Sequence, residues 1–192
     1  MQHDFFSEEK NLPRCALLEH PSDGYGPRTA DNARLADVTV AFAVDFTTSG
    51  ERLTHKKAGD KYVAVPYGSD IPEAAEALKR FMQKCEARTL NVAGNGLSTL
   101  SKFGVTQETA NKWVTAVLTE VLKSVKLRHL RSGGQTGIDT AGLVAGLALG
   151  IPVTGLYPKG FRRRLATGVD VASSAGELIL DLDSQVANLR QK

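Results

Sequence analysis

The chain has 192 residues, of which 42% are hydrophobic and 23% are charged, with a formal net charge of +3. This composition is that of a globular protein and excludes an intrinsically disordered chain. The longest nearly apolar run, residues 141–153, is too short to cross a bilayer, and residues 1–10 lack the pattern of an export signal, so we expect a cytoplasmic protein without a membrane partner.

The length fits one α/β domain over residues 1–192. We expect residues 1–27 to form an irregular amino-terminal extension that contains a short edge strand at residues 15–18. Residues 28–37 predict a short helix capped by Thr29.

Strand and helix patterns then alternate along the middle of the chain. Residues 38–44 are almost continuously apolar, which is typical of a parallel strand buried on both faces. Residues 61–67 and 89–93 predict further strands, with helices expected over residues 51–58 and 74–85.

The second half continues the alternation. Residues 106–126 predict the clearest helix, residues 127–130 a strand, residues 141–149 a small-residue helix and residues 153–157 another strand. Residues 177–182 predict a last short strand before a carboxyl-terminal helix. The repeated units predict a Rossmann-like fold, with a mostly parallel sheet and helices on both faces.

A glycine-rich turn between a predicted strand and helix is the strongest candidate for a ligand site. Its glycines allow close backbone approach, and the following helix directs unpaired N–H groups toward an anion such as phosphate. The alternative is a tight turn that needs glycine only for packing. Asp139 either favours the helix dipole or contacts a ligand hydroxyl or metal-bound water. The candidate residues are Ser132, Gly133, Gly134, Gln135, Thr136, Gly137 and Asp139.

Other candidates follow predicted strands, whose carboxyl ends bind ligands in parallel sheets. The turn formed by Thr47, Thr48, Ser49 and Gly50 predicts a second phosphate or ribose site, although hydroxyl-rich turns also satisfy themselves locally. Arg28 suits a bidentate phosphate contact or a surface salt bridge, and Lys159 ends another strand. The basic runs at residues 123–131 and 162–164 favour a phosphorylated ligand or form a solvated face.

Two sequence blocks carry a family resemblance. Residues 132–139, followed by Pro158-Lys159-Gly160, resemble the molybdenum-carrier proteins of the SLOG superfamily, which is named after Smf/DprA and the LOG enzymes and has a Rossmann-like fold. Residues 25–29 with Asn32, then residues 36–40, and then residues 48–50 with Leu53 and Thr54 resemble the family's Arg-Thr, Asn, acidic-strand and second glycine-turn segments. Because the second set normally follows the first, the resemblance implies a circular permutation, which neighbouring surface termini would permit.

The resemblance implies a sensor or sequestering protein that binds a nucleotide or nucleotide-derived ligand, and a homo-oligomer. It favours the phosphate contact for Arg28 and adds Thr29, Asn32, Gly94 and Asn95 to the ligand-binding candidates. The first alternative is a LOG-like nucleoside-monophosphate phosphoribohydrolase, but a lysine stands where that enzyme's turn carries glutamate. A molybdenum-cofactor carrier is a further alternative.

The remaining residue patterns predict no other chemistry. The four histidines lack metal-ligand spacing, so we expect no metal site, and no cofactor is certain. No pair of carboxylates is recognisable as a catalytic dyad. Nucleic acid is not an expected partner, because the basic clusters lack interleaved aromatic residues.

Overall fold

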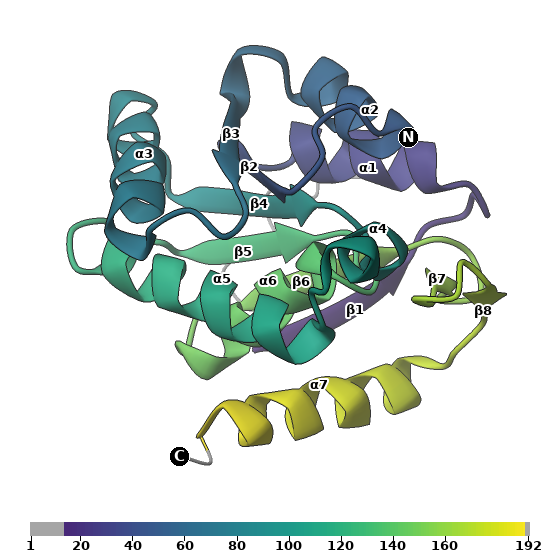
Figure 1. The fold of residues 1–192 in the computed structure, drawn as a ribbon. Helices are drawn as coiled ribbons and strands as arrows, with labels where there is room; N and C mark the ends of the chain where they lie inside the picture. The colour runs from purple at the N-terminus through teal and green to yellow at the C-terminus, as the bar shows by residue number, and fades with distance from the viewer. Residues whose placement is uncertain (1–13, 191–192) are drawn as a thin grey trace.

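A computed structural model describes residues 14–190, which form a parallel sheet between two layers of helices (Figure 1). The strand order is β1-β6-β5-β4-β2-β3, and all neighbouring strands are parallel. The strands are β1 (Cys15–Glu19), β2 (Val38–Ala43), β3 (Tyr62–Pro66), β4 (Thr89–Gly94), β5 (His129–Ser132) and β6 (Val153–Tyr157). The predicted α/β class is therefore confirmed.

The helices are divided between the two faces of the sheet. One face carries α1 (Tyr25–Arg34) and α2 (Ser49–Ala58), which pack on each other. The other carries α3 (Ile71–Lys84), α5 (Gln107–Leu122), α6 (Ile138–Ala148) and α7 (Ala175–Arg190). The short α4 (Leu97–Leu100) follows β4, and β7 (Arg163–Arg164) pairs antiparallel with β8 (Asp170–Val171).

The chain changes winding direction between β2 and β4. From β2 it continues outward through α2 to β3, whereas from β4 it continues through α5 to β5 in the opposite direction. Right-handed crossovers place the intervening helices on opposite faces. The diverging connections leave a crevice at the carboxyl ends of β2 and β4, which is where open α/β sheets bind ligands.

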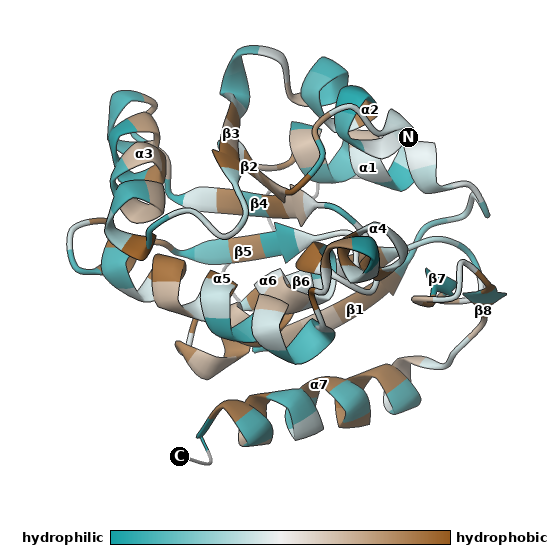
Figure 2. Cartoon of the chain, in the orientation of Figure 1, coloured by the Kyte–Doolittle hydropathy of each residue, from teal (hydrophilic) through white to brown (hydrophobic). Residues whose placement is uncertain are grey.

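The two helical layers differ in how they contact the sheet. Most residues of the apolar core come from the strands and from α3, α5, α6 and α7, and its described members include none from α1 or α2. Thr39, Asn91, Arg131 and Thr154 instead form a buried row across β2, β4, β5 and β6. Figure 2 shows α1 and α2 as mostly hydrophilic. The α1–α2 layer therefore packs largely through polar groups.

The amino-terminal part of the described chain is more ordered than predicted. The expected edge strand is confirmed, because β1 pairs with β6 at the sheet edge. Within the predicted irregular extension, residues 15–19 and 25–27 lie in β1 and α1, and residues 1–13 lie outside the described residues. Helix α1 begins at Tyr25, so the Thr29 cap is wrong: the Thr29 hydroxyl donates to the Tyr25 carbonyl inside the helix. Pro27 fits the first turn because no N–H is needed there.

The predicted strand at residues 177–182 is also wrong, because this segment lies in α7. Ser174 and Glu177 exchange side-chain and backbone hydrogen bonds at its start, which is a capping arrangement. Leu178 and Leu182 are buried one helical turn apart. The Leu-Ile-Leu run therefore belongs to a helical period. No helix in residues 14–190 is long and apolar enough to span a membrane.

Candidate functional site

A cavity of about 390 Å³ lies at the carboxyl ends of β2 and β4. Its walls come from α1, the first two turns of α2, β4 and the segment after it, the turn before α6 and the start of that helix, and β7. The structure brings eleven predicted residues to this cavity: Arg28, Thr29, Asn32, Thr48, Ser49, Gly50, Gly94, Asn95, Gly133, Gln135 and Asp139. Both predicted loops therefore contribute to one site, with the end of β4 between them.

The other predicted residues do not line this cavity. The Ser132 hydroxyl is buried and donates to the Val92 carbonyl at 2.8 Å. The Thr47 amide and hydroxyl both donate to Asp45 at 2.7 Å. The remaining residues outside the cavity wall are Gly134, Thr136, Gly137 and Lys159.

The glycine turn is largely closed by contacts within the protein. The Gly137 amide donates to Gln107 Oε1 at 2.6 Å, and the Ile138 amide donates to the Asn95 carbonyl at 3.2 Å. Gly134 and Gly137 have positive φ, and a Cβ at Gly134 would lie 2.2 Å from the Tyr157 ring. At these two positions glycine serves packing, which was the alternative to a phosphate cradle.

Gly133 makes room for a buried ion pair. Arg28 Nη1 lies 3.1 Å from Asp139 Oδ2, and both side chains are less than a tenth exposed. The Gln135 amide also donates to Asp139 at 3.4 Å. Burial raises the pKa of Asp139, and the Arg28 guanidinium partly offsets that effect. Arg28 is therefore already paired with a carboxylate, while its Nε has no partner in the described chain.

Glu51 is the main cavity residue that the sequence analysis missed. It lies in the first turn of α2, is 3% exposed, and its Oε2 has no partner within residues 14–190. Burial, followed by the charges of Asp139 and Asp45, raises the pKa of Glu51 to about 8. The cavity thus holds two carboxyl groups whose pKa values are both raised by burial.

The cavity lining carries further polar atoms without hydrogen-bond partners. Asn32 is 2% exposed, and neither its side-chain Nδ2 nor its Oδ1 has a hydrogen-bond partner in the described part of the chain. Asn91 donates to Thr39 at 3.3 Å, but its Oδ1 is also unpaired. Asn95 differs, because its side chain accepts from the amides of residues 44 and 45 and so holds the turn after β2.

The first turn of α2 is an open helix amino terminus. Thr48 caps it by accepting the Glu51 amide at 3.2 Å. The amides of Ser49 and Gly50 have no acceptor among the described residues, and both residues line the cavity. Unpaired backbone N–H groups were predicted at the 132–139 turn, and the first turn of α2 also offers such groups to the cavity.

Sequence reasoning missed several other wall residues: Tyr25, Leu53, Thr54, Asn91, Ala93, Gly96, Ser98, Thr99 and Arg164. The basic run at residues 162–164 was the only signal for Arg164. Within residues 14–190 no cluster of three or more histidine, cysteine, aspartate or glutamate side chains is suited to a metal.

The winding of the sheet and the cavity at its switch point define a Rossmann-like α/β protein. The model of the circularly permutated YpsA SLOG family matches residues 1–118 and 130–169, and the chain belongs to this family. The permutation predicted from the order of the sequence blocks is confirmed. Comparison with curated proteins finds no match.

Proposed function

We propose that this protein binds a nucleotide or nucleotide-derived phosphorylated ligand in the cavity, as a sensor or sequestering protein. The observation that carries the proposal is the set of buried polar atoms without partners on Asn32, Glu51 and Asn91. A buried unpaired polar group costs about 1–3 kcal/mol. A polar ligand that pairs with these atoms would recover that free energy.

The distribution of donors supports a ligand with one anionic and one neutral part. The open amides of Ser49 and Gly50 suit a phosphate at a helix amino terminus. The amide of Asn32 offers a donor and an acceptor to a base or sugar. The volume of about 390 Å³ lies within the range of small-molecule sites.

Titration calorimetry against AMP, ADP, cyclic mononucleotides, NAD and ADP-ribose tests the proposal. We expect at least one ligand to bind, and Asn32→Ala to weaken its binding roughly 10-fold or more because a buried amide contact is lost. Gln83→Ala, at an exposed position of α3, is the matched control and should bind normally. Absence of binding heat across the panel would contradict the proposal.

A second candidate function is cleavage of an N-glycosidic bond, which the two carboxyl groups in the cavity favour. Two carboxyl groups in different surroundings can divide the acid and base roles, and here Glu51 has no partner whereas Asp139 is paired with Arg28. In this scheme the protonated Glu51 gives a proton to the departing base. Asp139 takes one from the water that attacks the sugar carbon, so water replaces the base.

Incubation with AMP, CMP and GMP, followed by chromatography for free base, separates the two functions. Hydrolysis predicts base release that is lost in both Glu51→Gln and Asp139→Asn. Binding without base release would eliminate hydrolysis and leave the binding function in place.

A further inference from the structure

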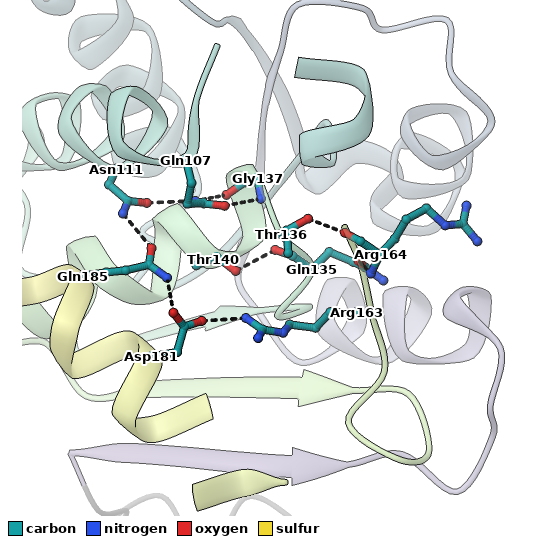
Figure 3. Close-up of polar contacts among 10 residues, drawn as sticks. All are labelled: Gln107, Asn111, Gln135, Thr136, Gly137, Thr140, Arg163, Arg164, Asp181 and Gln185. Carbon is teal, nitrogen blue, oxygen red and sulfur yellow. Dashed lines mark hydrogen bonds and ion pairs between the residues drawn. The ribbon is translucent and has the colours of Figure 1, made fainter. Parts of the chain in front are cut away.

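The two arginines of β7 point to opposite sides of their strand (Figure 3). Arg163 extends toward α7, where its Nη1 lies 2.7 Å from Asp181 Oδ2. Arg164 extends away from α7 and belongs to the cavity wall. Alternation along a strand thus gives neighbouring arginines different surroundings.

The backbone of Arg164 is attached directly to the turn before α6. Its amide donates to Gln135 Oε1 at 2.8 Å, and its carbonyl accepts a hydrogen bond from the Thr136 hydroxyl. Gln135 is itself a cavity residue. The position of Arg164 is therefore tied to the wall of the site.

A series of side-chain hydrogen bonds supports the β7–β8 pair from the side of α7 (Figure 3). Beyond the Arg163–Asp181 pair, Gln185 donates to Asp181 at 3.0 Å and accepts from Asn111 at 2.8 Å. Asn111 accepts from Gln107, which also binds both backbone groups of Gly137. This series of hydrogen bonds leads from Arg163 through α7 and α5 to the turn before α6, which also binds the backbone of Arg164. The position of β7 is therefore fixed from both sides.

The guanidinium of Arg164 is the more accessible of the two cations in the cavity wall of the described chain. Its side chain is 48% exposed, whereas that of Arg28 is 7% exposed and paired with Asp139. Arg164 makes two contacts with Asp170 of β8, at 2.8 and 3.2 Å. It also lies 5.3 Å from the centroid of the Tyr25 ring, another cavity residue.

We infer that Arg164 captures the anionic group of the ligand, exchanging the Asp170 carboxylate for ligand phosphate while it rests on Tyr25. A guanidinium makes the same paired contacts with a phosphate as with a carboxylate. Asp170 then acts as a competitor that holds the guanidinium in place until the ligand arrives. This inference rests on the proposed nucleotide-binding function.

Calorimetry with AMP, ADP-ribose and adenosine tests the inference on two variants, one expected to weaken the binding of phosphorylated ligands and the other to tighten it. Arg164→Gln should weaken AMP and ADP-ribose roughly 10- to 100-fold and leave adenosine nearly unchanged, because a charge-assisted contact is lost. Asp170→Asn should tighten both phosphorylated ligands about 2- to 10-fold, because competition for the guanidinium falls. Arg162→Gln is the control, since Arg162 contacts the Asp23 carbonyl outside the cavity wall.

A purely structural Arg164–Asp170 pair predicts that both variants weaken binding, and that result would overturn the inference. Unchanged affinity of Arg164→Gln for AMP and ADP-ribose would overturn it while the proposed function stands. No heat from the wild type with these three compounds or with ADP, cyclic mononucleotides and NAD would overturn both. If Arg164→Gln does not fold, Arg164→Lys retains the charge without the paired geometry and should show a smaller loss confined to the phosphorylated ligands.

Discussion

At position 51, a glutamate in the first turn of a helix is buried at the cavity wall instead of facing solvent. Glutamate is common in that turn because it favours the helix dipole, so its identity alone suggests a surface residue. Burial and the nearby carboxylates reverse that expectation and favour the neutral acid. The function of such a residue depends on its surroundings more than on its position in the helix.

Glu51→Gln should flatten the dependence of stability on pH. The pKa of Glu51 is about 8 in the folded chain, against 4.5 for an unperturbed glutamate, so its contribution is complete below about pH 4.5 and is lost as pH rises to 8. Between pH 5 and 8 the wild type should lose roughly a few kcal/mol more unfolding free energy than the variant. Urea unfolding at both pH values measures this.

Two comparisons sharpen that experiment. Burial lowers the pKa of His129 to about 4, so His129 makes stability rise with pH between about 4 and 6.5, but this effect is common to both proteins. Glu108→Gln, at an exposed position of α5, should keep the wild-type slope. A slope in Glu51→Gln equal to that of the wild type would refute a raised pKa at this position.

Gly133→Ala should destabilise the protein by about 3–5 kcal/mol, the cost of breaking a buried ion pair. The added Cβ would lie 1.2 Å from Arg28 Nη1 and 2.4 Å from Asp139 Oδ2, so the pair cannot keep its geometry. Gly176→Ala in α7 is the control, because no atom lies within 4 Å of its added Cβ. Urea unfolding measures both variants, and a loss below about 1 kcal/mol at position 133 would show that the ion pair adapts.

Among the elements, helix α5 holds the glycine turn in place through a single side chain. Gln107 accepts from the Gly137 amide at 2.6 Å and donates to the Gly137 carbonyl at 2.9 Å. The Gln107 side chain thereby pairs both backbone groups of Gly137. Through these hydrogen bonds the turn connects α5 with the start of α6, and the Ile138 amide connects it with the segment after β4.

Gln107→Ala should lower the unfolding free energy by about 2–3 kcal/mol, because the buried Gly137 amide is left unpaired. Gln83→Ala removes a side chain of the same type from an exposed position of α3 and should have little effect. Thermal or urea unfolding of the two variants makes the comparison. Equal stability of both would mean that water replaces the Gln107 contacts.

Across the whole molecule, the two faces of the sheet have different stabilising interactions. The face under α3, α5, α6 and α7 buries the apolar core, whereas α1 and α2 cover polar residues and the cavity. Apolar burial is the main favourable contribution to folding, and polar contacts contribute less. The α1–α2 layer should therefore open more readily than the rest.

Native-state hydrogen exchange tests this asymmetry. Amides of α1 and α2 should exchange through partial openings, whereas those of α5 and α6 should require openings close to global unfolding. A ligand that pairs with Asn32 and Glu51 should slow exchange most in α1 and α2, since it adds contacts to that layer. Uniform protection of both faces without ligand would contradict the expectation.

Much of the fold could be predicted because local patterns specify it. The apolar run of β2 and the periodicity of α5 each follow from neighbouring residues, and the order of the sequence blocks predicted the permutation. The prediction failed at residues 177–182, because a short apolar run is compatible with both a strand and a helix and only its packing decides between them. It also failed at Thr29, where an intrahelical hydrogen bond replaced a cap.

The sequence by itself determined the parallel α/β architecture and the loops that meet at the cavity, because strand and helix periods are local properties. Only the tertiary structure decided which side chains face that cavity. Glu51 and Asp139, or Arg164 and Tyr25, are far apart in the chain and become neighbours only through packing of the sheet and its helices. The glycine turn illustrates the difference, since its amides were predictable but their partners, Gln107 and the Asn95 carbonyl, were not.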